Sequence, residues 1–170
     1  MLVHLIWTFT TEGSINSSPA VYDGKLYFGS DDGKVYCIYA CIGTEIWNYT
    51  TGDAVSSSPT IFDDNVYICS ENGKIYCLDA QNGNHIWENL TGGSVNSSPA
   101  VADGFVYVGS DDGKMYCLAS NGTESWNYSI GDKIQSSPAV ADEKVYVGSH
   151  DGKIYCLNSL QKVHKKILQQ

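Results

Sequence analysis

The triplet Ser-Ser-Pro occurs four times in this chain, and a serine hydroxyl can act as a nucleophile. Each triplet begins ten residues after a tryptophan, and the triplets end at Pro19, Pro59, Pro99 and Pro138. A catalytic serine needs a base within hydrogen-bond reach, most often a histidine. No histidine recurs beside the triplets, since the four in the chain are scattered: His4, His85, His150 and His164. We therefore interpret these serines as structural and predict no catalytic residue.

Acidic turns are the second candidate for chemistry, as carboxylates can bind calcium or act as bases. The repeated turns end at four glycines: Gly33, Gly73, Gly113 and Gly152. A calcium loop alternates its oxygen ligands, and Asp31-Asp32-Gly33 does not. Aspartate and glycine are typical of tight turns, because the carboxylate bonds to nearby backbone and glycine adopts positive φ. We predict no metal site here, and the scattered histidines do not suggest one either.

Six cysteines could support metal binding or disulfide chemistry. Four of them share one position of the repeat: Cys37, Cys77, Cys117 and Cys156. Cys41 and Cys69 lie outside that position. No Cys-x-x-Cys is present, so the spacing fits no zinc pattern. We expect small buried thiols, while a disulfide that involves Cys41 stays open.

Composition excludes several classes of partner. The chain of 170 residues has a formal net charge of −9 and a pI near 4.6, and its ten basic residues are all lysine. A protein that binds nucleic acid or an anionic membrane needs clustered basic residues, so we expect neither as a partner. No apolar run is long enough for a membrane span. The residues around Met1 do not resemble a signal peptide, so the compartment is unknown, and extracytoplasmic if the chain is part of a longer exported protein.

The elements that must position these residues follow from the repeat. Tryptophans recur at intervals of 40, 40 and 39 residues, at Trp7, Trp47, Trp87 and Trp126. A period near 40 with internal strand signals indicates repetition of one small sheet. The third copy predicts strands at about 98–102, 105–109, 114–118 and 124–128, joined by Asp-Gly and Asn-Gly turns. Each copy is thus expected to be an antiparallel meander.

Both faces of each predicted sheet are apolar. In the third copy Val106 and Val108 lie on one face and Tyr107 on the other. Such a sheet must be covered on both sides, as stacked neighbours do in a propeller. We predict an all-β fold, a β-propeller of four four-stranded antiparallel blades. The predicted blades span about 8–47, 48–87, 88–126 and 127–158, with an outer strand at 1–10, so the repeats fill 1–158 and a non-repeat tail fills 159–170.

The repeated phrase resembles the PQQ-like (pyrroloquinoline-quinone-type) propeller repeat. It is clearest from Ser97-Ser98-Pro99 through Gly113-Lys114 to Trp126, and the match covers roughly 5–158. WD40-type repeats fit less well, as no Gly-His or Trp-Asp signature is present. The resemblance implies eight blades per ring and a docking tryptophan in each blade. The family includes quinone-dependent alcohol dehydrogenases, non-enzymes such as BamB-like outer-membrane protein assembly factors, and sensor domains of kinases.

Ring closure is left open between three alternatives. The chain could be part of a longer protein, half of an eight-bladed ring that closes as a homodimer, or a four-bladed ring in which the first strand completes the last blade. The tail spaces Leu160, Val163 and Ile167 like one face of a short helix. The alternatives are a frayed helix, a disordered end and a helix that binds a partner.

The sequence predicts a non-catalytic scaffold that binds proteins or other ligands. The resemblance implies that the quinone enzymes use a calcium ion, an aspartate base and adjacent cysteines. No adjacent cysteines occur here, and the aspartates obey the repeat. We therefore expect neither PQQ nor calcium as a cofactor. The expected partner is a protein or the remaining blades of a larger propeller, and the alternatives are a fragment of a PQQ-dependent dehydrogenase and a BamB-like assembly factor.

Overall fold

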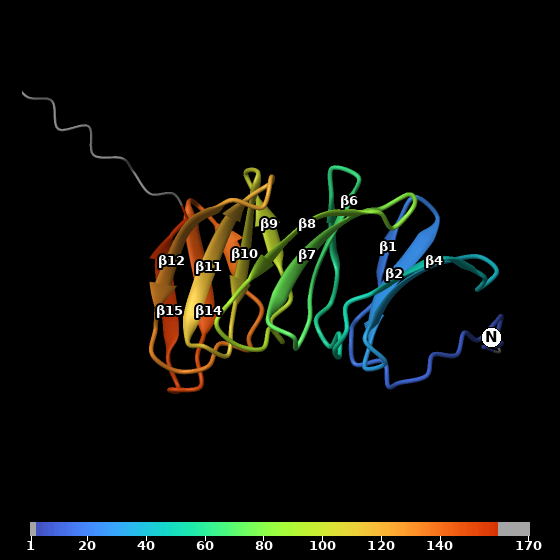
Figure 1. Cartoon of the computed structure of the whole chain (residues 1–170), viewed down its shortest axis with the longest axis horizontal. Helices are drawn as coiled ribbons and strands as arrows, with labels where there is room; N and C mark the ends of the chain where they lie inside the picture. The colour runs from blue at the N-terminus through green and yellow to red at the C-terminus, as the bar shows by residue number, and fades with distance from the viewer. Residues whose placement is uncertain (1–2, 160–170) are drawn as a thin grey trace, which may run out of the picture.

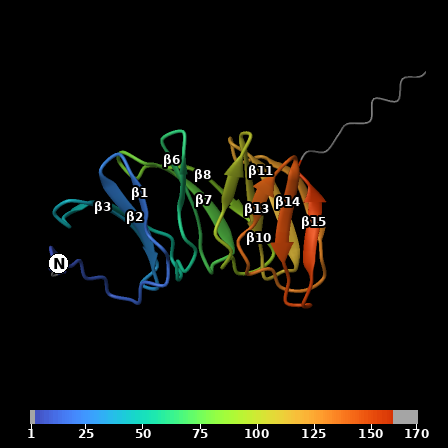
Figure 2. The ribbon, with the colours of Figure 1, turned by 180° about the vertical axis from the view of Figure 1, so that it is seen from behind.

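The structure is a computed structural model of the chain, and it describes residues 3–159. The described part is all β, with four separate antiparallel sheets in chain order (Figures 1 and 2). None of it forms a helix that could cross a membrane. The predicted all-β propeller of about 40-residue blades is confirmed. The predicted tail lies outside the described residues, apart from Ser159.

Each sheet is a meander in which consecutive strands pair, and we call the sheets blades 1 to 4. Blade 1 consists of β1 (Ala20–Tyr22), β2 (Lys25–Ser30), β3 (Lys34–Tyr39) and β4 (Glu45–Thr50). Blade 2 consists of β5 (Thr60–Phe62), β6 (Asn65–Cys69), β7 (Lys74–Asp79) and β8 (His85–Leu90). Blade 3 consists of β9 (Ala100–Ala102), β10 (Phe105–Gly109), β11 (Lys114–Ala119) and β12 (Glu124–Ser129). Blade 4 has three strands, β13 (Ala139–Ala141), β14 (Lys144–Gly148) and β15 (Ile154–Asn158).

Local sequence sets the turns of each blade. The first strand begins one residue after the proline of the Ser-Ser-Pro triplet, where a missing N–H disturbs the ladder least. The turn between first and second strands requires positive φ, which Asp103 (52°) and Gly104 (76°) adopt in blade 3. The next turn places Gly113 at φ 79°, so that a glycine is required there too.

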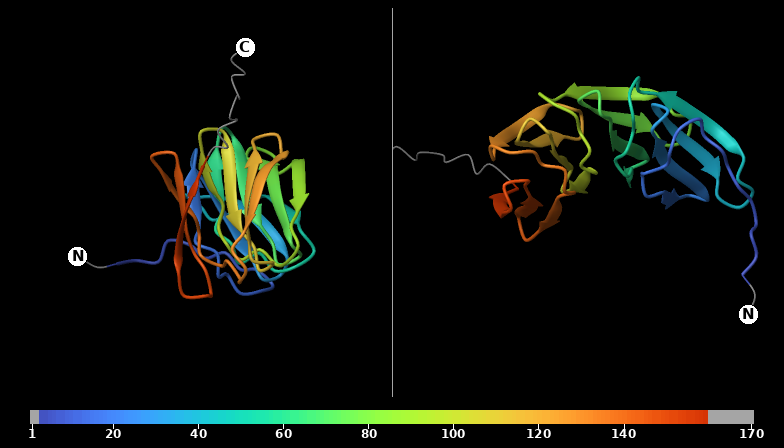
Figure 3. Two further views of the ribbon diagram at one scale, coloured as in Figure 1. Left: turned by 90° about the vertical axis from the view of Figure 1, so that its left-hand side faces the viewer. Right: turned by 90° about the horizontal axis from the view of Figure 1, so that it is seen from below.

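The four blades follow an arc, with the first and last sheets at its opposite ends (Figure 3). The short first strands contact one another in sequence, β1 with β5, β5 with β9 and β9 with β13. Small side chains such as Ala20 and Ala100 suit this crowded inner edge. A ring closed within one chain is therefore not the arrangement in this structure, where blades 1 and 4 lie apart.

The core lies between the blades rather than within them. We call the side of each blade that packs on the next blade its forward face, and the opposite side its rear face. Between blades 1 and 2, Tyr27, Cys37 and Trp47 of the forward face pack on Val66 and Leu78 of the rear face. Each strand has a period of two, so alternate residues serve one face and then the other. Stacking therefore buries both apolar faces, as the sequence predicts.

The N-terminal segment differs from the prediction. An outer strand was expected at 1–10, but residues 3–19 contain no strand. Trp7 and Phe9 instead pack on the rear face of blade 1, against Phe28 and Tyr36. A strand needs a neighbouring ladder, and β15, whose outer edge has no partner strand among the described residues, is at the far end of the arc.

Candidate functional site

The tryptophans form a repeated docking site between blades. The indole N–H of Trp47 donates to the carbonyl oxygen of Ala80, 33 residues later, at 3.2 Å. The other tryptophans make the same bond 33 residues on, to the carbonyls of Ala40 (3.1 Å), Ser120 (2.8 Å) and Ser159 (3.1 Å). The indoles of Trp47, Trp87 and Trp126 are almost fully buried, and Trp7 is half-buried. Each indole thus anchors its own segment to the next blade.

A second set of residues in this docking site was missed by the sequence analysis. Three glycines lie under the indoles: Gly43, Gly83 and Gly122. A Cβ on Gly83 would be 2.7 Å from the ring of Trp47, and this glycine has φ 73°. The signal was present, because each glycine follows its tryptophan by 35 or 36 residues. The missed glycines pack directly against the indole rings, and a side chain at these positions would collide with the rings.

The first serine of each triplet braces its own blade. The hydroxyl of Ser57 accepts from the amide of Cys69 at 2.8 Å and also bonds to its carbonyl. Ser17 and Ser97 accept in the same way from Gly29 (3.0 Å) and Gly109 (3.2 Å). No hydrogen bond joins these serines to a histidine in residues 3–159. They therefore hold the link between blades against the second strand.

The second serine connects one blade to the next. The amide of Ser18 donates to the hydroxyl of Ser58 at 2.9 Å. The pattern continues from Ser58 to Ser98 at 2.8 Å and from Ser98 to Ser137 at 3.2 Å. In each pair the backbone amide of the earlier blade donates to the serine hydroxyl of the next blade. The serines therefore form a chain of hydrogen bonds that runs in one direction along the inner edge of the arc.

The turn aspartates bond to tyrosines rather than to one another. The hydroxyl of Tyr116 donates to Asp112 at 2.5 Å, and burial raises the pKa of Tyr116 to about 12, helped by that carboxylate. In blade 4 the Tyr155 hydroxyl and then the Lys153 ammonium lower the pKa of Asp151 to about 2. These carboxylates are occupied as acceptors beside Gly113 and Gly152, which lie in the turns.

The cysteines differ by position. Cys37, Cys77 and Cys117 are fully buried on forward faces, while Cys156 is exposed, contrary to the expectation for its repeat position. The reason is that blade 4 has neither a fourth strand nor a following blade in the described chain. Cys69 is buried and Cys41 is exposed, and both have free thiols.

The turns between first and second strands gather carboxylates at one end of the arc. Six exposed acidic residues lie in these turns: Asp23, Asp63, Asp64, Asp103, Asp142 and Glu143. They share this end because every first-to-second turn lies at the same edge of its meander. One contact crosses between blades, from the hydroxyl of Tyr22 to Asp64 at 2.8 Å. We call this set the acidic rim; it offers negative charge to a partner.

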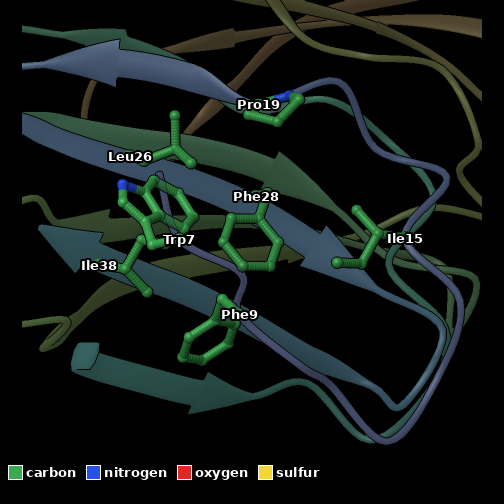
Figure 4. A pocket seen from close by; sticks show the side chains of 7 residues that line it. All are labelled: Trp7, Phe9, Ile15, Pro19, Leu26, Phe28 and Ile38. Carbon is green, nitrogen blue, oxygen red and sulfur yellow. The ribbon is translucent and has the colours of Figure 1, made fainter. Parts of the chain in front are cut away.

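A small cavity lies under the N-terminal segment. Its volume is about 120 Å³, and it is lined by apolar side chains of the segment and of blade 1 (Figure 4). Trp7 and Phe9 face Phe28 across it. Pockets for organic ligands usually measure about 300–1,000 Å³. The cavity is therefore a gap in the cover of blade 1 rather than a ligand site.

The residues do not suit a calcium–quinone site of the kind that the quinone enzymes use. Within residues 3–159, no three of the His, Cys, Asp and Glu side chains cluster closely enough to hold a metal ion. The turn aspartates already accept from tyrosines, as at Asp32, whose carboxylate takes the hydroxyl of Tyr36 at 2.8 Å. The expectation that no such cofactor binds remains a prediction.

Comparison with known families gives one match that covers most of the chain. A family model described as outer membrane protein assembly factor BamB matches residues 4–98 and 71–163. A comparison with curated proteins found no match.

Three solved structures share the fold. BamB from Moraxella catarrhalis is 22% identical with a TM-score of 0.79, covering 91% of this chain and 49% of its own. The computationally designed Ika4 protein is 15% identical with a TM-score of 0.83, covering 93% of this chain and 99% of its own. A quinohemoprotein alcohol dehydrogenase from Pseudomonas putida is 17% identical with a TM-score of 0.73, covering 89% and 33%. This chain thus spans about half the length of the natural BamB.

Proposed function

Since this chain belongs to the family of the outer membrane protein assembly factor BamB, and is a PQQ-like propeller repeat protein, we propose that it is a non-catalytic scaffold that binds another protein. One observation carries the proposal. The side chains that could do chemistry already make structural hydrogen bonds: Ser57 and Asp112 within their own blades, and Ser98 between two blades.

The acidic rim indicates the kind of partner. Its carboxylates are exposed and come from all four blades, and the chain as a whole has a net charge of −9. Charge of one sign on a surface steers partners of the opposite sign and fixes their register. A basic segment of a protein therefore suits this surface best.

A lysine-rich peptide is a direct probe of this surface. We expect binding that weakens with salt, because exposed charges are screened over about 10 Å at 0.1 M. The double variant Asp23→Asn and Asp103→Asn should weaken binding by about fivefold. The control is Asp132→Asn, which removes an exposed carboxylate from a link between blades. Equal binding by both variants in a fluorescence titration would contradict the rim as the binding surface.

The second candidate function is that of a fragment of a PQQ-dependent dehydrogenase. It is favoured by the fold shared with the quinohemoprotein alcohol dehydrogenase. The test is a dye-linked alcohol assay after incubation with PQQ and calcium. We expect no turnover; activity of this chain above that of free PQQ would overturn the non-catalytic proposal.

A role in assembly of outer-membrane proteins is the more specific form of the scaffold proposal. It rests on the description of the matched family, and it requires an extracytoplasmic location as part of a longer exported protein. Cell fractionation with an antibody against this chain would test the location. Unchanged levels of outer-membrane proteins in cells that lack it would argue against the assembly role.

A further inference from the structure

The two ends of the arc carry faces that pair with each other everywhere inside it. The forward face of blade 4 is open, with Ile154 76% and Tyr146 39% exposed, whereas the equivalent Met115 and Tyr107 of blade 3 are 0% and 1% exposed. At the other end, Val21 on the rear side of blade 1 is 68% exposed. The chain thus ends in two complementary half-interfaces.

Among residues 3–159, blade 4 also has no fourth strand, and the N-terminal segment could supply one. Residues 5–10 read Leu-Ile-Trp-Thr-Phe-Thr, and β4 at 45–50 reads Glu-Ile-Trp-Asn-Tyr-Thr. The segment already docks on blade 1 as β4 docks on blade 2, since the Trp7 indole bonds to the Ala40 carbonyl at 3.1 Å. It is therefore held where an outer strand would lie, but it has no ladder to join.

The register of such a ladder follows from the other blades. In blade 3, Cys117 pairs with Trp126 and Met115 with Tyr128. In blade 1, Cys37 pairs with Trp47 and Val35 with Tyr49. The equivalent pairs for β15 are Cys156 with Trp7 and Ile154 with Phe9. Edge strands such as β15 present a row of N–H and C=O groups ready for this pairing.

In the link that follows a blade, one apolar side chain packs against a glycine of that blade's second strand. This contact, too, has one half at each end of the arc. Ile134 lies against Gly109, where an added Cβ would be 2.2 Å from its side chain, and Val55 lies against Gly29 in the same way. The equivalent residue before blade 1 is Ile15, which is 45% exposed. The equivalent glycine of blade 4 is Gly148, near which an added Cβ would meet nothing closer than 3.4 Å.

The directional chain of serines ends in the same mismatch. Ser137 accepts from Ser98, but no described residue accepts from its own amide in the way that Ser137 serves Ser98. At the opposite end the hydroxyl of Ser18 occupies the accepting position and receives no such amide within residues 3–159. Blade 4 thus offers the amide of Ser137 as a donor, and the start of blade 1 offers the hydroxyl of Ser18 as an acceptor.

We propose that a second copy of this chain closes the ring. In this dimer, residues 5–10 of each copy form the outer strand of the other copy's blade 4, and Ile15 plugs the space at Gly148. Every contact then repeats one found between adjacent blades. Two arcs that each match about half of BamB make a ring of eight blades. A head-to-tail contact that closes after two copies has two-fold symmetry.

The mass in solution tests this dimer. We expect light scattering to give twice the chain mass of 18.5 kDa, about 37 kDa. The variant Ile154→Lys should reduce it to 18.5 kDa, because a charge would enter the buried interface. That residue is exposed in the single chain, so the blade itself should keep its circular dichroism spectrum. The matched control Ile86→Lys changes an exposed isoleucine of β8 in the middle of the arc and should remain dimeric.

A monomer for the unaltered chain would overturn the proposal, since other blades would then have to cover these faces. A dimer that survives Ile154→Lys would overturn it as well, because the contact would lie elsewhere.

Cysteine cross-linking tests the register. The pair Phe9→Cys and Ile154→Cys, with Cys41 and Cys156 replaced by serine, should form a disulfide between copies, since opposed Cα atoms lie about 4.5–5.5 Å apart. Thr8→Cys with Ile154→Cys is the control, because Thr8 points to the other face of the strand. We expect a reducible band of doubled mass only for the first pair. Equal cross-linking by both pairs would contradict the register.

Discussion

Blades 3 and 4 contain nearly the same residues, but their burial differs. Blade 3 has neighbours on both faces, and Tyr107, Cys117 and Trp126 are buried beneath blade 4. In blade 4 the equivalent Tyr146 and Cys156 are exposed. The strands keep the same register in both sheets, Val106 with Leu118 and Val145 with Leu157. Local sequence thus specifies the meander, while stacking supplies the core that stabilises it.

The largest expected effect comes from removing an indole between two blades. We expect Trp87→Ala to lower the free energy of unfolding by about 4 kcal/mol, since it empties a buried site between blades 2 and 3. Trp7→Ala should cost about half as much in a chain held monomeric by Ile154→Lys, because Trp7 is only half-buried. Urea unfolding followed by circular dichroism measures both. Equal losses would mean that a neighbouring blade adds nothing to a docked indole.

Substitution of a glycine that packs against an indole should lower the free energy of unfolding by a smaller amount. We expect Gly83→Ala to cost about 3 kcal/mol, from the left-handed backbone and from the 2.7 Å approach of its Cβ to Trp47. Gly24→Ala is the control: Gly24 has φ 70° but nothing within 4 Å, so the left-handed backbone alone should cost about 1 kcal/mol. If the two variants unfold at the same urea concentration, the indole does not rest tightly on Gly83.

High pH should weaken the interior interfaces before the open face. Burial raises the pKa of Tyr107 and of Cys117 to about 12, above the ordinary values of 10.0 for tyrosine and 9.0 for cysteine. The protonated forms are thus favoured by folding, so their stabilisation is complete below about pH 9 and is lost as the pH rises toward 12. The urea midpoint should fall over this window. In a chain held monomeric by Ile154→Lys, Tyr107→Phe with Cys117→Ala should flatten the fall, whereas Tyr146→Phe should leave it nearly unchanged, because Tyr146 is then exposed.

The smallest change is in thiol reactivity, which reports burial without altering stability. At pH 8 we expect Cys41 to react with a thiol reagent, because it is exposed. The fully buried Cys69, Cys77 and Cys117 should react only on unfolding, because burial raises the pKa of Cys77 and Cys117 to about 12. Mass spectrometry after alkylation identifies the labelled residues. Rapid labelling of Cys117 in the folded chain would show that blades 3 and 4 separate.

Much of the fold could be predicted from sequence, because its signals are local and repeated. Alternation in 105–109 and the Asp103-Gly104 turn fix strand and turn within a few residues. The N-terminal strand could not be predicted correctly, since its ladder depends on β15 at the other end of the arc. The exposure of Cys156 was missed for the same reason: burial is set by a neighbour and not by the repeat position.

The docking residues were only half predictable. Tryptophan stands out by its rarity and spacing, whereas Gly83 looks like any turn glycine until the indole of Trp47 is seen above it. Val55 and Ile134 plug the space beside Gly29 and Gly109, but their segments contain no strand and so carry no periodic signal. The indole bonds between blades join residues 33 positions apart, and the serine bonds join residues 39 or 40 positions apart. Strand patterns do not encode such spacings.

The indole bond across 33 residues also defines the cassette by which such a chain can grow or shrink. A cut between two sheets separates a tryptophan from the carbonyl that receives it, whereas a cut just before one tryptophan and just before the next removes a whole period and leaves matching ends. Duplication of a gene segment with those ends would lengthen the array without inventing a new surface. The unit that contains a whole indole bond is therefore staggered relative to the visible sheets.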